Sequence, residues 1–136
     1  NVHKLQLIQN TLARVVVGAR KRDHITPVLR QLHWLPVVYR IQYKIAILTF
    51  KAITTDKPGY LSELISFDQP TRQLRSSAHR RLTVTRCRTN FGSRAFYHAA
   101  PAVWNGLPSA ITSNLLTLDA FKRAVKTHLF EQSVHQ

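Results

Sequence analysis

The sequence predicts a mainly α protein, a small helical bundle with a basic loop and a short β segment in the middle. Apolar residues recur at helical spacing in 2–17, 37–54 and 117–132, which is the pattern of helices that bury one face. The segment "RLTVTR" at 81–86 instead alternates apolar and polar residues, as a short strand does.

The composition is that of a folded chain with a large positive charge. Its 136 residues suffice for one domain or two small ones, and 44% of them are hydrophobic. The net charge of +14 favours an acidic partner, nucleic acid first and an anionic membrane surface second. Because Cys87 is the single cysteine, we expect no internal disulfide and a reducing compartment. The chain starts at Asn1 and contains no methionine, so we expect a piece of a longer polypeptide or a fragmentary gene model.

Two helices are expected in the first third of the chain. Residues 2–17 should form an amphipathic helix that Gly18 ends. Its expected inner face is Leu5, Ile8, Leu12, Val15 and Val16. Thr26-Pro27 should begin a short helix that reaches about His33, because the hydroxyl can cap it and proline suits its first position.

The segment 37–54 is expected to be the central helix, buried on two sides. Its aliphatic side is Val37, Ile41, Ile45, Leu48 and Ala52, and its aromatic side is Tyr39, Tyr43, Ala46 and Phe50. A narrow basic strip of Arg40, Lys44 and Lys51 lies between them. The aromatic side packs within the bundle or, if it is open, marks an interface with a missing domain.

A basic linker and a second helical segment are expected in the remainder. Residues 69–118 contain no acid. Ser93 can cap a helix through about Ala99 that Pro101 interrupts, and a last helix should run from about Thr117 to Gln132. The expected inner face of that last helix is Leu118, Phe121, Val125 and Leu129. The chain is therefore divided into a helical segment at 1–65, a basic linker with a short strand at 66–92, and a C-terminal helical segment at 93–136.

Both tryptophans are followed by Leu-Pro, in "HWLPVV" at 33–38 and in "VWNGLP" at 103–108. Proline stops a helix, and a large ring at that point can cover the end of a core. We therefore expect Trp34 and Trp104 to be buried at two corners of the fold. The alternative is that they stack on nucleic-acid bases.

The sequence contains no visible catalytic constellation. Its six acids are scattered, whereas two-metal phosphoryl chemistry needs clustered carboxylates. One cysteine and seven scattered histidines lack metal-ligand spacing. No apolar run approaches the roughly 18 residues that span a bilayer. We expect no enzymatic activity, no metal or other cofactor, no small-molecule substrate and no membrane partner.

Six segments carry a resemblance to a known family. They are "LQLIQNTLARVVVGARKRDHITPVL", "LHWLPVVYRIQYKIAILTFKA", "PGYLSELI", "LRSS", "FGSRAFYHAAPAVWNGLP" and "FKRAVKTHLF". Together they resemble the carboxy-terminal part of the open-reading-frame-two protein of LINE-type, non-LTR retrotransposons of the jockey-like branch. They occur in that family's order and spacing over essentially the whole chain.

The resemblance implies a role in copying element RNA at a DNA nick. The family's protein carries an endonuclease and a reverse transcriptase, an RNA-directed DNA polymerase, but its Tyr-x-Asp-Asp motif matches no position here. What the resemblance implies for this chain is the thumb-like, post-polymerase segment at 1–65, followed by a basic helical module. It also implies a nuclear location and two partners, RNA or DNA and the missing polymerase domain.

Two interpretations of the function stay open. The first is a non-catalytic nucleic-acid-binding module, since the arginine fork binds phosphate bidentately and stacks on bases. Its candidate contact residues are Arg72, Arg75, Arg80, Arg81, Arg86, Arg88 and Arg94, with Arg20, Lys21 and Arg22 as a second patch. The alternatives are a loop kept basic for solubility and, for the second patch, a nuclear-import signal.

The second interpretation is a helical interaction or scaffold module that packs against the missing polymerase domain without contacting nucleic acid. The two-sided apolar helix at 37–54 favours it. A basic amphipathic membrane helix, for 117–132 alone, is a third interpretation that the family resemblance disfavours.

Overall fold

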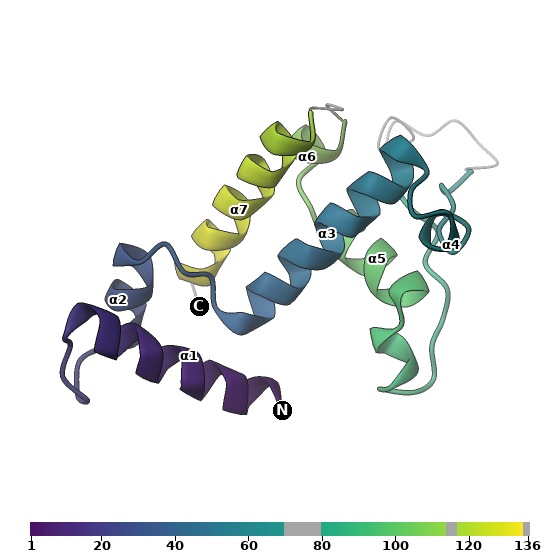
Figure 1. Cartoon of the computed structure of the whole chain (residues 1–136). Helices are drawn as coiled ribbons and strands as arrows, with labels where there is room; N and C mark the ends of the chain where they lie inside the picture. Colours follow the sequence, from purple (N-terminus) through teal and green to yellow (C-terminus); the bar gives the residue numbers. More distant parts are fainter. Residues whose placement is uncertain (70–79, 114–116, 135–136) are drawn as a thin grey trace. The chain divides into compact units, whose positions relative to one another are not determined.

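The computed structural model describes residues 1–69, 80–113 and 117–134, without the side chain of Val134. The described residues are mainly helical (Figure 1), so the prediction of a mainly α bundle is confirmed. The chain divides into two compact units, unit 1 with Asn1–Tyr43 and Lys126–Gln136 and unit 2 with Lys44–Val125. Two long helices, α3 (Val37–Thr55) and α7 (Leu118–Val134), therefore each contribute to both units.

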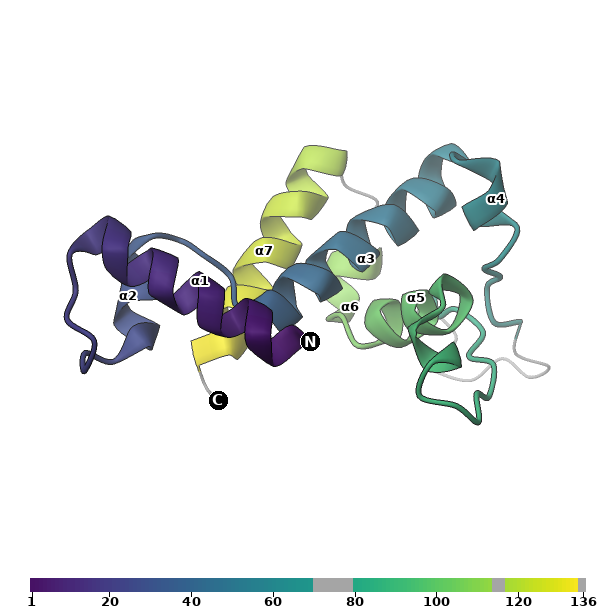
Figure 2. The same cartoon turned by 60° about the horizontal axis from the view of Figure 1, so that its bottom comes forward.

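Unit 1 begins with helices α1 (Val2–Val17) and α2 (Ile25–Gln31), which lie against each other in Figures 1 and 2. Gly18 ends α1 in the left-handed region at φ 70°, where a residue without Cβ is unstrained. The bounds predicted for α1 are thus confirmed, whereas α2 starts one residue before Thr26 and ends at Gln31. The core between the two helices is Ala13, Val28 and Leu29, with Val17, Ala19, Ile25, Leu32 and Trp34 packed against it.

The face that α1 turns inward is not the predicted one. Ile8 is 57% exposed and Val15 is 75% exposed, and Leu5, Leu12 and Val16 are exposed as well. Gln9 and Ala13 are buried instead. Hydrogen bonds explain the orientation, because Gln9 Nε2 donates to the carbonyl of Leu35 at 2.8 Å and the backbone N–H of Val37 donates to Gln6 Oε1 at 2.8 Å. The carboxamides thereby pair backbone groups just before and at the start of α3.

Unit 2 holds the second half of α3, then α4 (Gly59–Ser62), a short 3₁₀ helix η2 (Gly92–Arg94), α5 (Phe96–Asn105), α6 (Ser109–Ser113) and the first half of α7. Its core is built on aromatic rings. The ring of Phe121 stacks on that of Phe50 with centroids 4.2 Å apart and lies 5.8 Å from that of Trp104. Such contacts add to the free energy gained by burying the rings.

Along α3, the aromatic side is the more deeply buried one. Tyr39 and Phe50 are buried and Tyr43 is half-buried, whereas Ile41 on the aliphatic side is exposed. Ordinary core packing of the aromatic side is therefore confirmed, and that side is not an open interface. The predicted inner face of α7 is also confirmed, with Phe121, Val125 and Leu129 buried.

Two predictions for the middle of the chain are wrong. The described residues at 81–86 form no strand but one antiparallel bridge, between Leu82 and Phe67. The helix expected from Ser93 to Ala99 is instead η2 followed by α5, which continues past Pro101 to Asn105. Pro101 removes one helical hydrogen bond, but it is itself fully buried, together with Ala100 and Trp104, and this packing stabilises the helix.

Candidate nucleic-acid interface

The arginine segment, residues 80–94, runs alongside α5 in the opposite direction and then turns back into it (Figure 1). At its start, the indole Nε1 of Trp104 donates a hydrogen bond of 2.9 Å to the backbone carbonyl of Arg80. Trp104 is 2% exposed, so this bond ties the first arginine to the core of unit 2.

The side chain of Asn105 holds the backbone at Leu82. Its Oδ1 accepts from the N–H of Leu82 at 2.9 Å, and its Nδ2 donates to the carbonyl of Leu82 at 2.8 Å. One carboxamide thus pairs both backbone groups of a residue that is 2% exposed, as a neighbouring strand would. The backbone on either side of Leu82 also pairs with residues 66–68, because the N–H of Asp68 donates to the carbonyl of Arg81 and the N–H of Thr83 donates to the carbonyl of Ser66, both at 2.9 Å.

The segment is anchored a third time at Thr85. The imidazole Nδ1 of the buried His98 lies 3.0 Å from the carbonyl of Thr85 and 3.1 Å from its hydroxyl oxygen. The bonds to Trp104, Asn105 and His98 all come from α5. The backbone from 80 to 85 is therefore held along one helix.

A hydrogen-bonded turn closes the segment. Thr89 Oγ1 accepts from the N–H of Gly92 at 3.0 Å, and the carbonyl of Thr89 accepts from the N–H of Ser93 at 3.0 Å. Ser93 Oγ donates to the carbonyl of Asn90 at 2.9 Å. The turn leads directly into η2 and then α5.

The arginine side chains on this fixed backbone are exposed. They are Arg80, Arg81, Arg86, Arg88 and Arg94. Among the residues that the structure describes, the one ion pair joins Lys122 to Asp119 at 3.1 Å, so none of these five guanidinium groups is held by a carboxylate. Arg80 lies over the ring of Phe67, 5.0 Å from its centroid, which holds its charge at the surface without neutralising it.

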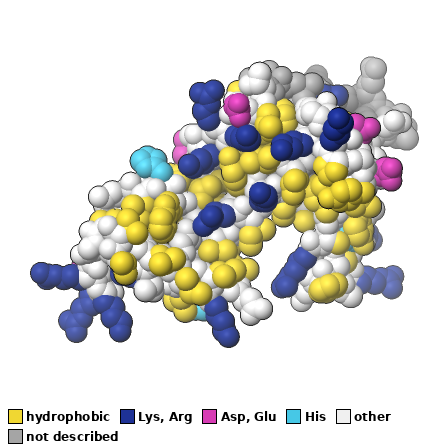
Figure 3. Space-filling view, viewed as in Figure 1, with side chains coloured by type: hydrophobic (Ala, Val, Ile, Leu, Met, Phe, Trp, Pro, Cys, Tyr) yellow, Lys and Arg dark blue, Asp and Glu magenta, His cyan; other side chains and the backbone are white. Residues whose placement is uncertain are grey.

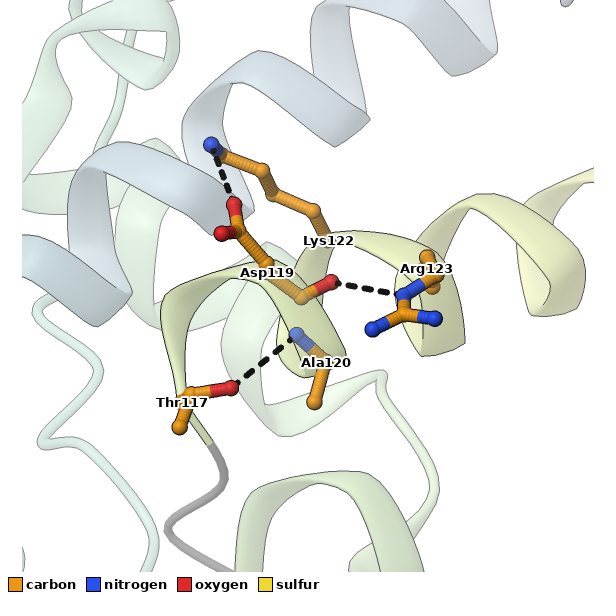
Figure 4. Close-up of polar contacts among 5 residues, drawn as sticks. All are labelled: Thr117, Asp119, Ala120, Lys122 and Arg123. Atoms are coloured by element: carbon orange, nitrogen blue, oxygen red, sulfur yellow. Dashed lines mark hydrogen bonds and ion pairs between the residues drawn. The ribbon is translucent and has the colours of Figure 1, made fainter.

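The basic side chains at the start of α7 are arranged differently. Figure 4 shows Lys122 paired with the carboxylate of Asp119, and Arg123 Nε donating to the backbone carbonyl of the same residue at 3.4 Å. Part of the positive charge there is therefore compensated locally, unlike that of the described arginines at 80–94.

The second predicted patch lies in the turn between α1 and α2. Arg20, Lys21 and Arg22 are exposed, and Asp23 follows them. Asp23 Oδ2 accepts from the backbone N–H of Arg20 at 2.7 Å, so this patch contains an acid where the arginine segment contains none. The remaining predicted residues, Arg72 and Arg75, lie outside the described residues.

Two concave regions differ in their suitability for a phosphate. A pocket of about 160 Å³ in unit 2 is lined by Arg80, Arg81, Trp104, Asn105, Leu107, Ser109 and Thr112. A larger one of about 1080 Å³ in unit 1 is lined mainly by carboxamides, hydroxyls and apolar groups, with Glu131 and neither lysine nor arginine. Of the two, only the smaller pocket has arginine side chains in its lining, those of the first two residues of the arginine segment.

The described parts of the chain contain neither a candidate metal site nor a helix that could cross a membrane. No group of three His, Cys, Asp or Glu residues among them could hold a metal ion. None of their helices is both long enough and apolar enough to cross a bilayer.

The residues that sequence reasoning missed are those that hold the segment. Trp104 was expected to be buried, and it is, but its indole donor had no predicted partner. Trp34 is only half-buried, so the corner prediction holds fully for one tryptophan alone. His98 and Asn105 carry no sequence signal of their own, because each pairs with a residue 13 to 23 positions away.

Comparisons of the chain with family models, curated proteins and solved structures found no match. The resemblance to LINE-type proteins therefore stays a prediction that rests on the sequence motifs.

Proposed function

We propose that this chain is a non-catalytic nucleic-acid-binding module. In this proposal it is a C-terminal part of a non-LTR retrotransposon reverse transcriptase that helps hold template or target nucleic acid during target-primed reverse transcription in the nucleus. The observation that carries the proposal is the arginine segment, with five exposed arginines on a backbone that α5 holds from 80 to 85 and that a hydrogen-bonded turn closes at 89–93.

A fixed backbone favours phosphate contact. Ordering a loop on binding costs roughly 1–2 kcal/mol per residue in backbone entropy. Residues 80–85, which α5 already holds, avoid much of that cost. Arginine binds phosphate through two parallel N–H groups. The absence of any acid from 69 to 118 leaves these groups without a competing carboxylate along the chain.

The test is the salt dependence of binding to a DNA duplex and to a single strand. If about four phosphates are neutralised on a duplex, the slope of log K against log salt is about −3.6, and affinity falls about 150-fold between 50 and 200 mM salt. Replacing Arg81, Arg86, Arg88 and Arg94 with Gln should flatten that slope toward zero. Arg80 is left in place because it packs on Phe67.

The matched control removes the same charge elsewhere. Replacing Arg40, Lys44, Lys51 and Lys57 with Gln changes four exposed cations outside the segment, and this variant should keep most of the slope. A third variant with Gln at Arg20, Lys21 and Arg22 tests the turn between α1 and α2. Equal slopes in the wild type and the segment variant would reject the proposal for this surface, provided that circular dichroism shows both folded.

One observation favours a second function, an interaction module that packs against the polymerase domain of a parent polypeptide. The exposed apolar residues of α1 include Leu5, Ile8, Leu12 and Val15, which repeat at three- and four-residue intervals as in the seam of a helix pair. Several exposed apolar residues on one helix face are typical of a protein interface.

The two functions are separated by substitutions on α1. Replacing Ile8 and Leu12 with Glu should abolish co-purification with a polymerase domain and leave the salt slope of nucleic-acid binding nearly unchanged. Unchanged co-purification would contradict the interaction function. The carboxamide side of α1, which holds Gln6 and Gln9, is left intact in this variant.

A further inference from the structure

Phe91 lies in the turn at the end of the arginine segment and is 87% exposed. It is the most exposed of the large hydrophobic side chains that the structure describes. An exposed ring contributes little to the stability of the fold, since the free energy of burying a phenylalanine, about 1.5–3 kcal/mol, is not gained.

The turn that presents Phe91 is closely packed. A Cβ on Gly92 would lie 2.7 Å from Cys87 Sγ and 2.8 Å from Thr89 Oγ1, so those two side chains fill the space beside the glycine. The hydrogen bonds of Thr89 and Ser93 span residue 91, whose φ and ψ are helical at −74° and −49°.

Arginines lie three residues before and three residues after the ring. Phe91 precedes η2, and the N–H of Arg94 donates to the carbonyl of Phe91 at 3.1 Å. Side chains three residues apart in a 3₁₀ turn emerge on the same side, so the side chain of Arg94 emerges on the same side of the turn as the ring of Phe91. Figure 3 shows Lys and Arg side chains projecting on either side of a hydrophobic patch at the end of the molecule where this turn lies (lower right).

We propose that Phe91 is a stacking platform for an unpaired nucleobase and that Arg88 and Arg94 bind the phosphates next to that base. This inference rests on the proposed function, because it names the form of nucleic acid that the arginine segment takes: a single strand. The bases of a duplex are already stacked on each other, so a ring on a surface turn gains nothing from them. On a single strand, each base that stacks on an aromatic side chain contributes about 1–3 kcal/mol.

The experiment uses a single strand about 12 nucleotides long, the same strand with abasic sites throughout, and a duplex of the same sequence. Phe91→Ala should lower affinity for the ordinary strand about 5- to 150-fold, the equivalent of 1–3 kcal/mol. Its affinity for the abasic strand and for the duplex should equal that of the wild type, and its salt slope should be unchanged.

Two further variants define the role of the ring. Phe91→Trp should keep the affinity for the ordinary strand, and the added indole fluorescence should be quenched by that strand and not by the abasic one. Phe91→Leu keeps apolar bulk without a π face and should lose most of the affinity that Phe91→Ala loses. Tyr60→Ala, which removes an exposed aromatic with no arginine near it in the sequence, is the control and should bind as the wild type does.

The outcomes separate the two proposals. If Phe91→Ala binds the ordinary strand like the wild type, or weakens the abasic strand equally, the stacking role is overturned while the salt-dependent phosphate contact stands. If the wild type itself binds no nucleic acid with a salt slope, the proposed function fails, and the stacking inference fails with it.

Discussion

The indole of Trp104 and the carbonyl of Arg80 are joined by a hydrogen bond of 2.9 Å that links the core of unit 2 to its basic surface. One end of the contact is an almost fully buried ring stacked near Phe121. The other end is the backbone of an exposed arginine. The position of the arginine segment is therefore coupled to the packing of the core, and changes in the core should also alter the nucleic-acid binding that we propose for this segment.

Truncating Trp104 should be strongly destabilising. Trp104→Ala should lower the free energy of unfolding by about 3–5 kcal/mol, since it removes a buried ring and leaves a cavity. Trp104→Phe keeps an aromatic ring and removes the N–H donor, and should cost about 1 kcal/mol for the lost hydrogen bond in addition to the cost of the smaller ring. Urea unfolding followed by circular dichroism measures both losses.

Trp34 is the matched comparison. Because its ring is half-buried, Trp34→Ala should cost less, about 1–2 kcal/mol. Equal losses at the two positions would contradict the difference in burial. A Trp34→Ala variant that melts like the wild type but binds nucleic acid poorly would favour base stacking at that residue.

Asn105 should tolerate neither truncation to alanine nor replacement by its isostere aspartate. Asn105→Ala leaves the N–H and the carbonyl of Leu82 without their partner and should cost about 1–3 kcal/mol. Asn105→Asp keeps an acceptor for the N–H but sets a carboxylate oxygen against the carbonyl. That contact disfavours the charged form and raises the pKa of the new carboxyl above its usual value of about 3.9.

The sign of the pH effect follows from that raised pKa. The protonated carboxyl can donate to the carbonyl of Leu82, so Asn105→Asp should gain stability relative to the wild type as the pH falls through the raised pKa, and lose it as the pH rises. Urea midpoints of the variant and the wild type at a series of pH values measure this difference. A difference that does not change with pH would show that this carboxyl does not face the carbonyl.

Gly92 should tolerate a methyl group only if its neighbours move. In Gly92→Ala the new Cβ meets Cys87 Sγ and Thr89 Oγ1. Both atoms end short side chains and can rotate away, but rotation of Thr89 breaks its bond to the N–H of residue 92, at a cost of about 1 kcal/mol.

A double-mutant cycle identifies the contact. Cys87→Ala opens space beside residue 92, so the double variant should be more stable than the sum of the single effects predicts, by about 0.5–1 kcal/mol. Gly59→Ala is the control, because a Cβ there meets nothing within 4 Å. Purely additive effects would mean that the thiol does not restrict this turn.

The sequence predicted helices well where local signals and packing agree. The bounds of α1 follow from periodicity and from Gly18, and α3 ends at Thr55, one residue past the predicted 54. The prediction that Pro101 interrupts a helix was wrong, since this buried proline lies inside α5. The prolines at 36 and 108 precede new helices as much as they stop old ones.

The candidate site could be predicted only in part. The candidate arginines could be identified by charge, because the run without acidic residues can be read directly from the sequence. The alternation at 81–86 predicted a strand, but the structure has one bridge, between Leu82 and Phe67, and the side chain of Asn105 pairs with the N–H and the carbonyl of Leu82. A side chain that pairs with backbone 23 positions away leaves no periodic pattern, so the anchors and the exposed ring of Phe91 required the structure.

The orientation of α1 gives the sharpest test of the fold. Periodicity predicts that Ile8 and Leu12 face a core, whereas in the structure they are exposed and Ala13 is buried against Val28 and Leu29. Replacing Ile8 and Leu12 with Gln should therefore change the free energy of unfolding by less than about 0.5 kcal/mol, as exposed substitutions do. Ala13→Leu should overpack the contact between α1 and α2 and cost about 1–3 kcal/mol. Urea unfolding of the two variants decides between the orientations. If Ile8 and Leu12 faced the core instead, the Gln variant would lose about 2 kcal/mol or more, and Ala13→Leu would change the free energy of unfolding little.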